Sequence, residues 1–260
     1  MLKKIAFATL TAISLFTSMN SLASNDLLSR IDAKGTISVA TEGTYPPFTY
    51  HDQTGKLTGY DVEVTRAIAE KLGVKVDFKE TQWDAMLAGL KAGRFDLVAN
   101  QVALSTPERQ AMFDLSDAYS WSGAALVVRA DNRHVKQPAD VQGIKVAQSL
   151  SSNYGELAVK NGAKVISVDG MAQALLLIQQ QRVEATFNNY LALLDYFNKN
   201  PTSSLKIIWQ DSEQLGAGLV VNKGNQAALA KINQAIMALH QDGTFKRLGE
   251  QFFGKDISVK

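Results

Sequence analysis

Short apolar runs alternate with amphipathic helical stretches along the first half of the chain. The run "TISVA" (36–40) alternates as a strand does, and "DVEVTRAIAEKLG" (61–73) repeats its apolar positions with helical spacing. The same patterns return in "VKVDF" (74–78), "WDAMLAGLKAG" (83–93) and "FDLVA" (95–99). An order of strand, helix and strand predicts βαβ units around a mostly parallel sheet.

The second half of the chain repeats this plan weakly. Three pairs of segments carry the likeness: 35–47 with 143–155, 91–100 with 179–188, and 123–132 ("GAALVVRADN") with 216–225 ("GAGLVVNKGN"). The repeat predicts two similar α/β lobes. Residues 24–119 with 216–260 would form lobe 1, and residues 120–215 would form lobe 2.

Two neighbouring strands would then cross between the lobes and form a hinge. Gly216 and Gly218 lie at the second crossing, where they either absorb backbone movement or allow close strand packing. The predicted fold class is therefore α/β, with two lobes, each a mostly parallel sheet flanked by helices, and a two-strand hinge.

The first 23 residues have the order of a secretory signal peptide. Lys3 and Lys4 precede an apolar stretch, and Ser21, Leu22 and Ala23 form a small-residue cleavage site. We therefore expect cleavage near Ala23 and export of the remaining chain.

Composition excludes several classes of protein. Without Lys3 and Lys4, the 27 basic residues become 25 and equal the 25 acidic ones, so nothing in the net charge favours nucleic acid or an anionic membrane. The absence of cysteine excludes thiol catalysis and zinc–thiolate sites. The three histidines have no metal-helix spacing, and neither a G-x-S-x-G nor a Walker motif occurs. We expect no metal and no cofactor.

Ligands of open α/β sheets collect beyond the carboxyl ends of the strands. Those ends carry aromatic, hydroxyl, amide and arginine side chains in residues 42–48, 100–109, 149–154 and 188–190. Arg109 is the notable member, because a guanidinium matches a carboxylate with two parallel hydrogen bonds. Alternatively, Thr106 to Arg109 is only the start of a helix with a solvated arginine.

The segment "GYDVEVTRAIAEKL" (59–72) resembles the signature of the polar amino-acid solute-binding proteins, the periplasmic receptors of ABC importers. "EGTYPPF" (42–48), "TPER" (106–109) and "DGTFKRLGEQFFG" (242–254) resemble the same family in the same order. The resemblance covers essentially the whole chain after Ala23. It implies the type II periplasmic binding protein fold and a binding protein rather than an enzyme.

Within that family, "NQV" (100–102) and "SNYGEL" (152–157) are most similar to the cystine-binding branch. The resemblance implies that Tyr45 closes over the ligand side chain and that Trp83 forms an apolar wall. It further implies that Arg109 clamps the ligand's α-carboxylate.

The predicted ligand-binding set contains aromatic side chains, amides, hydroxyls and one arginine: Tyr45, Phe48, Trp83, Asn100, Ala103, Ser105, Arg109, Ser152, Asn153 and Asn189.

Two positions depart from the family pattern. Residues 100–109 contain one residue more than the usual spacing, so Ala103 or Leu104 supplies the backbone donor and Ser105 or Thr106 the hydroxyl. Asn189 replaces the aspartate that pairs with the ligand ammonium in most members. An amide oxygen accepts from an ammonium without the charge of an ion pair, and Glu42 is placed to compensate.

We therefore predict a monomeric periplasmic receptor that binds a polar amino acid, with L-cystine the best candidate, and delivers it to the membrane permease of an ABC importer. No nucleic acid partner is expected. The alternative is a secreted dehydratase of the cyclohexadienyl type on the same fold, with Glu42 as its acid or base.

Overall fold

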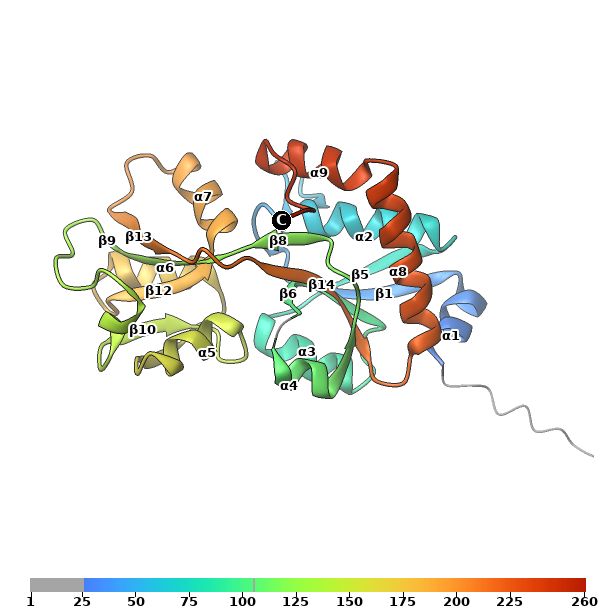
Figure 1. Cartoon of the computed structure of the whole chain (residues 1–260), viewed down its shortest axis with the longest axis horizontal. Coiled ribbons are helices and arrows are strands. Elements are labelled where there is room, and N and C mark those ends of the chain that lie inside the picture. The colour runs from blue at the N-terminus through green and yellow to red at the C-terminus, as the bar shows by residue number, and fades with distance from the viewer. Residues whose placement is uncertain (1–25, 105) are drawn as a thin grey trace, which may run out of the picture.

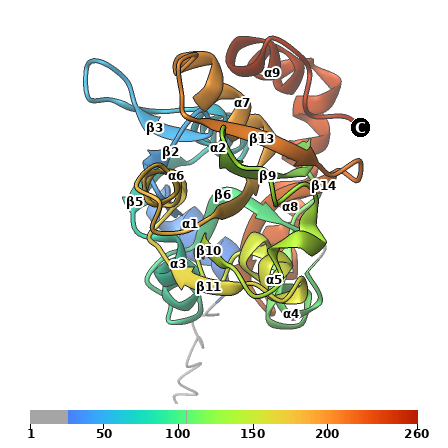
Figure 2. The same cartoon turned by 90° about the vertical axis from the view of Figure 1, so that its left-hand side faces the viewer.

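The computed structural model describes residues 26–104 and 106–260, so the predicted signal peptide and Ser105 lie outside the described residues. Two α/β lobes lie side by side and are joined by extended segments (Figure 1). In Figure 2, lobe 2 faces the viewer. The two-lobe fold predicted from the repeat is confirmed.

Lobe 1 is built on a six-stranded sheet in the order β5-β1-β6-β14-β7, with β8 paired to β14. Its strands are β1 (Thr36–Thr41), β5 (Lys75–Glu80), β6 (Leu97–Ala103), β7 (Phe113–Leu115), β8 (Ser120–Ser122) and β14 (Leu215–Asn222). Its helices are α1 (Leu27–Lys34), α2 (Tyr60–Lys71), α3 (Trp83–Lys91), α4 (Pro107–Met112), α8 (Gln226–Gln241) and α9 (Thr244–Phe253). A small sheet of β2 (Thr44–Tyr45), β3 (Thr49–His51) and β4 (Leu57–Thr58) adjoins it.

Lobe 2 repeats this topology in the order β11-β10-β12-β9-β13. Its strands are β9 (Ala124–Arg129), β10 (Lys145–Gln148), β11 (Lys164–Ser167), β12 (Ala185–Asn189) and β13 (Leu205–Gln210). Its helices are η1 (Pro138–Val141), α5 (Asn153–Lys160), α6 (Met171–Gln179) and α7 (Tyr190–Lys199). The near copies β9 and β14 run antiparallel to their neighbours, whereas β1, β5 and β6 and likewise β10, β11 and β12 are parallel.

The chain crosses between the sheets at two adjacent places. β8 ends at Ser122, opposite Leu215 in the lobe 1 sheet, and the backbone N–H of Asp211 donates to Ala124 O over 2.8 Å. A Cβ on Gly123 would lie 2.8 Å from Asp211 O, so only glycine permits this close approach.

Gly216 and Gly218 lie inside β14, where they pack closely. A Cβ on Gly216 would lie 2.9 Å from that of Ala118, and one on Gly218 would lie 2.8 Å from Leu104 Cδ2. Of the two alternatives left open for these glycines, strand packing agrees with these contacts.

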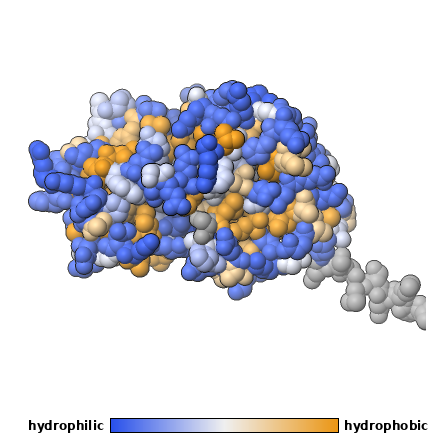
Figure 3. Space-filling view, viewed as in Figure 1, coloured by the Kyte–Doolittle hydropathy of each residue, from blue (hydrophilic) through white to orange (hydrophobic). Residues whose placement is uncertain are grey.

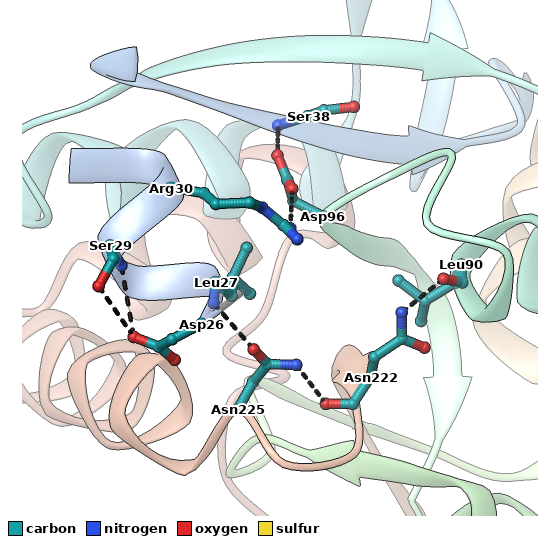
Figure 4. Close-up of polar contacts among 9 residues, drawn as sticks. All are labelled: Asp26, Leu27, Ser29, Arg30, Ser38, Leu90, Asp96, Asn222 and Asn225. Atoms are coloured by element: carbon teal, nitrogen blue, oxygen red, sulfur yellow. Dashed lines mark hydrogen bonds and ion pairs between the residues drawn. The ribbon is translucent and has the colours of Figure 1, made fainter. Parts of the chain in front are cut away.

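The N-terminal helix is fastened to lobe 1 by polar contacts (Figure 4). The Asp96 carboxylate accepts from the backbone N–H of Ser38 over 2.9 Å and from Arg30 over 2.7 Å, which ties α1 and β1 to the start of β6. Asn225 accepts from the backbone N–H of Leu27 over 2.9 Å. These contacts fix α1 against β1 and β6, the strands that position the site residues Glu42 and Asn100.

The view in Figure 3 shows a mainly hydrophilic surface with smaller hydrophobic areas. The large side chains of the core, such as Tyr60, Phe187 and Phe245, are fully buried. In residues 26–104 and 106–260, no helix is long and apolar enough to cross a membrane.

Strand β6 differs from its prediction. It continues through Asn100 to Ala103 instead of ending at Ala99, so Asn100 lies within the sheet and not in a following loop. Its pairing with β14 is irregular between Val98 and Val102, and Gln101 has φ 49°. Such a bulge re-aims side chains beside functional sites, and here it brings Asn100 and Gln101 to the space between the lobes.

Candidate functional site

The main cavity lies between the lobes and has about 510 Å³ of space free of protein atoms, its mouth included. Lobe 1 contributes Glu42, Tyr45, Trp83, Asn100 and Gln101, and lobe 2 contributes Gln148, Ser149, Ser152, Asn153, Tyr154, Val168, Gly170, Met171, Ala174, Thr186 and Asn188. A smaller hinge cavity adjoins it and shares Gln101, Asn153 and Tyr154 with it.

Tyr45 and Phe48 occupy different places. Tyr45 lines the main cavity, and its hydroxyl donates to Asn188 Oδ1 across the lobes over 2.6 Å. Phe48 is fully buried, with its ring 5.6 Å from that of Tyr45 and 5.2 Å from that of Phe253. Contrary to our expectation, Phe48 therefore does not line the cavity, because it packs behind Tyr45 in the core.

Glu42, which follows β1, and Asn100, in the middle of β6, form a pair. Asn100 Nδ2 donates to Glu42 Oε2 over 2.6 Å, while Asn100 Oδ1 accepts from the backbone N–H of Glu42 over 2.9 Å. Burial raises the pKa of Glu42 to about 7, an effect that the nearby charge of Asp84 increases and the bond from Asn100 opposes. Among the described lining residues, Glu42 carries the one carboxylate.

Asp61 holds the bulge of β6 in place through two hydrogen bonds to Gln101. This fully buried carboxylate accepts from the backbone N–H of Gln101 over 2.6 Å and from its side-chain Nε2 over 2.7 Å. Both bonds act on the residue with positive φ. Burial raises the pKa of Asp61 to about 7.

Arg109 is 3% exposed and bridges the lobes. Nη1 donates to Ala103 O over 3.2 Å, and Nη2 donates to Ser151 O of lobe 2 over 3.0 Å. The guanidinium also lies 5.6 Å from the Trp83 ring centroid, and Trp83 lines the main cavity. Arg109 is thus not a solvated surface side chain, although it lines neither cavity itself.

The N-terminus of α5 faces the main cavity. Ser152 caps this helix: its hydroxyl accepts from the backbone N–H of Gly155 over 2.9 Å and donates to Ser149 O over 2.8 Å. The hydroxyl is thereby occupied, but the first backbone N–H groups of a helix have no partner inside it. Those of Asn153 and Tyr154 are therefore the donors that this end offers.

Asn189 lines the hinge cavity rather than the main one, as does Ala103. Its Oδ1 caps α7 by accepting from the backbone N–H of Leu191 over 2.9 Å, and it accepts from Ser122 Oγ over 2.9 Å. We expected this oxygen to receive a ligand ammonium. The Leu191 N–H and the Ser122 hydroxyl already occupy it.

A second contact between the lobes was not expected from the sequence. Asp84, in the first turn of α3, accepts from Ser151 Oγ over 2.7 Å and from the backbone N–H groups of Ser151 and Leu150 over 2.9 and 3.1 Å. Nothing in the pattern around Asp84 distinguishes it from an ordinary first-turn acid.

Two lining residues inside elements of lobe 2, Ala174 in α6 and Thr186 in β12, escaped prediction, and so did four at strand ends, namely Gln148, Val168, Gly170 and Met171. Gln148 is the last residue of β10, and the other three follow β11. Applying the strand-end rule to "KVIS" (164–167) would have found these three. In the part of the chain that the structure describes, no group of three or more His, Asp or Glu side chains is placed to hold a metal ion.

A binding site between two α/β lobes joined by two crossing strands is typical of a solute-binding protein. Residues 37–255 match the family model "Bacterial extracellular solute-binding proteins, family 3", and the chain belongs to that family.

Relatives with assigned names are similar along nearly all of their length. The chain is 46% identical to a probable amino-acid ABC transporter-binding protein of Haemophilus influenzae, covering 99% of this chain and 100% of that one. It is 48% identical to the L-cystine-binding protein TcyA of Bacillus subtilis, covering 90% and 87%. These relatives are transport proteins, so the chain is a binding protein, not an enzyme, and the dehydratase alternative gains no support.

Two solved structures of solute-binding proteins can be compared with this chain. The L-cystine solute receptor of Neisseria gonorrhoeae, unliganded and open, is 63% identical, covers 90% of this chain and all of that one, and has a TM-score of 0.60. An ancestral arginine-binding protein bound to arginine is only 36% identical, covers 85% and 99%, and has a TM-score of 0.80. Over the whole chain, the structure is therefore more similar to the arginine-bound protein than to the open receptor.

Proposed function

We propose that the chain is the receptor of an amino-acid ABC importer and that it binds L-cystine between its lobes. The observation that carries the proposal is the main cavity, which both lobes enclose and which combines one carboxylate with a helix N-terminus. The names of TcyA and of the gonococcal receptor, both cystine-binding, support this ligand.

One carboxylate of the ligand would lie at the N-terminus of α5. Asn153 and Tyr154 are the first two residues of this helix and line the cavity, and helix N-termini favour anions. Arg109 would turn from Ser151 O toward this carboxylate, since its guanidinium is charged and already stands beside the same loop.

Glu42 would receive an ammonium group of the ligand. It faces the main cavity, whereas the oxygen of Asn189 is already engaged by Leu191 and Ser122. Tyr45 and Trp83 supply aromatic walls on which the apolar middle of the ligand can pack. Ala103 and Asn189 would border the ligand from the hinge cavity.

Lobe 2, expected from the sequence as residues 120–215, would move against lobe 1 about the two crossings, Gly123 and the segment 211–214. Because β8 (Ser120–Ser122) and Leu215 pair in the lobe 1 sheet, the moving part would be residues 124–210. Each chain contains both walls of the cavity, so a monomer suffices for binding. Cleavage near Ala23 would release the mature protein into the periplasm, where it would meet its permease.

A thermal-shift panel with the twenty L-amino acids and L-cystine tests the proposal. A ligand present at a hundredfold excess over its Kd stabilises the folded state by about 2.7 kcal/mol. We expect the largest shift with L-cystine, and its recovery unchanged by mass spectrometry. A shift with another amino acid alone, or with none, would refute the cystine assignment.

A further inference from the structure

Two buried hydrogen-bond donors, on side chains that line the main cavity, have no partner. Trp83 Nε1, at the start of α3 in lobe 1, and Gln148 Nε2, at the end of β10 in lobe 2, are two of the three partnerless buried side-chain nitrogen or oxygen atoms in the described residues. The two side chains are 8% and 3% exposed, and both line the main cavity.

An unpaired buried donor destabilises a protein, and native proteins contain few of them. Two in one cavity, on opposite lobes, indicate an acceptor that belongs to the ligand. The Arg109 guanidinium carbon lies over the Trp83 ring, 5.6 Å from the ring centroid, and adds positive charge to this wall of the cavity. An anionic acceptor therefore suits the pair better than a neutral one.

Glu42 lines the same cavity as the two donors and lies near residues adjacent to each of them. Its Oε1 is 3.5 Å from the position of a Cβ on Gly170, and the backbone N–H of Val168, two residues earlier, donates to Gln148 O over 3.1 Å. On the lobe 1 side, the charge of Asp84, the residue after Trp83, acts on Glu42. The cavity is thus lined by one carboxylate that can accept from a cationic group and by two side chains with unpaired donors for an anionic group.

We propose that Glu42, Trp83 and Gln148 form a second head-group subsite for an α-amino acid, separate from the carboxylate position at the N-terminus of α5. Glu42 binds the ammonium of the second head, and Trp83 Nε1 and Gln148 Nε2 donate to its carboxylate. This inference rests on the proposed function and adds that the receptor recognises both ends of a bis-α-amino acid. Trp83 is then a polar contact as well as the apolar wall expected from the sequence.

Half-modified ligands test the subsite. The mixed disulfide of L-cysteine with cysteamine lacks the second carboxylate, and that of L-cysteine with 3-mercaptopropionate lacks the second ammonium. Calorimetric titration should show wild-type protein binding each at least tenfold more weakly than L-cystine.

The variants should separate the two groups. Trp83→Phe and Gln148→Met should weaken L-cystine at least tenfold and the cysteamine disulfide less than twofold, because the missing carboxylate removes their partner. Glu42→Gln should weaken L-cystine at least tenfold and the mercaptopropionate disulfide less than twofold. The control Trp209→Phe, whose ring packs on Phe187, should change no affinity more than twofold.

Equal losses for L-cystine and the half-modified ligands in these variants would overturn the subsite. If wild-type protein binds no L-cystine, the proposed function fails, and the variants are titrated with the amino acid that the panel identifies. In that case the subsite requires that the identified amino acid have a side chain with a hydrogen-bond acceptor. If the protein instead prefers amino acids with an apolar or purely cationic side chain, the subsite is overturned.

Discussion

Asp84 Oδ1 lies 2.7 Å from Ser151 Oγ and joins the first turn of α3 in lobe 1 to the loop before α5 in lobe 2. The same carboxylate accepts two backbone N–H groups of that loop. Neither residue lines the main cavity, so this contact favours closure of the lobes without touching a ligand placed there.

We predict that at pH 8.5, where Glu42 is ionised with or without the Asp84 charge, Asp84→Asn weakens every ligand by the same factor. The amide keeps one acceptor and loses the charge, which removes about 1 kcal/mol from the closed state, roughly fivefold in affinity. Stopped-flow measurement should place most of this change in the dissociation rate. Asp77→Asn, an exposed acid on β5, serves as control, and a ligand-dependent change in affinity would contradict the interpretation.

The pKa of Glu42 predicts how affinity depends on pH. Its value of about 7 in the free protein falls when an ammonium binds, because the charge favours the carboxylate. The proton is released on binding, so affinity for L-cystine should fall by about fivefold to tenfold from pH 7.5 to pH 6. Calorimetry should show a flatter profile for Glu42→Gln, and an identical slope in both proteins would exclude Glu42.

The same raised pKa predicts the effect of Glu42 on stability. The folded protein holds a proton on Glu42 between its ordinary value of 4.5 and about 7, whereas the unfolded chain releases it. Stability of the unliganded protein therefore decreases as pH rises through this range. Denaturant titration at pH 8 should find Glu42→Gln more stable by up to about 3 kcal/mol, and a less stable variant would contradict the burial argument.

Arg109 should be needed for carboxylate binding. Arg109→Ala leaves the ligand carboxylate without its charged partner, so affinity for L-cystine should drop by about 3 kcal/mol, more than a hundredfold. Arg109→Lys should recover only part of the loss, because lysine cannot form the two parallel bonds. The exposed Arg94→Ala is the control, and unchanged affinity in Arg109→Ala would refute the clamp.

Asp61 should stabilise the bulge at Gln101. Asp61→Asn turns one accepting oxygen into a donor that faces another donor, and we expect a loss of about 2 kcal/mol in the free energy of unfolding. Glycine adopts positive φ freely, so the same change in a Gln101→Gly background should lose less than half as much. Glu63→Gln, also in the first turn of α2, controls for the helix charge. Equal losses in both backgrounds would contradict this role.

Periodicity predicted the regular elements because their burial follows the period of the backbone. The segments that became β1, α2, β5 and α3 were all found in this way, and the near copies β9 and β14 revealed the repeated topology. The short strands β7 and β8 were missed, since three residues are too few for a pattern.

The site was predicted in part, and its failures have physical causes. Asn100 interrupts an apolar run and was therefore read as the start of a loop, but the bulge held by Asp61 keeps it in β6. Phe48 looked like a partner of Tyr45 at the cavity, yet tertiary packing against Phe253 turns it into the core. The unpaired donors of Trp83 and Gln148 depend on what surrounds each atom, which no spacing in the sequence records.

The most direct test of the account is an isothermal titration of the purified protein with L-cystine at pH 7.5, followed by mass spectrometry of the released ligand. We predict saturable binding of one L-cystine per chain, with a Kd in the micromolar range or below, and recovery of the ligand unchanged. No binding heat, or conversion of the ligand to a product, would contradict the assignment of this chain as a cystine receptor.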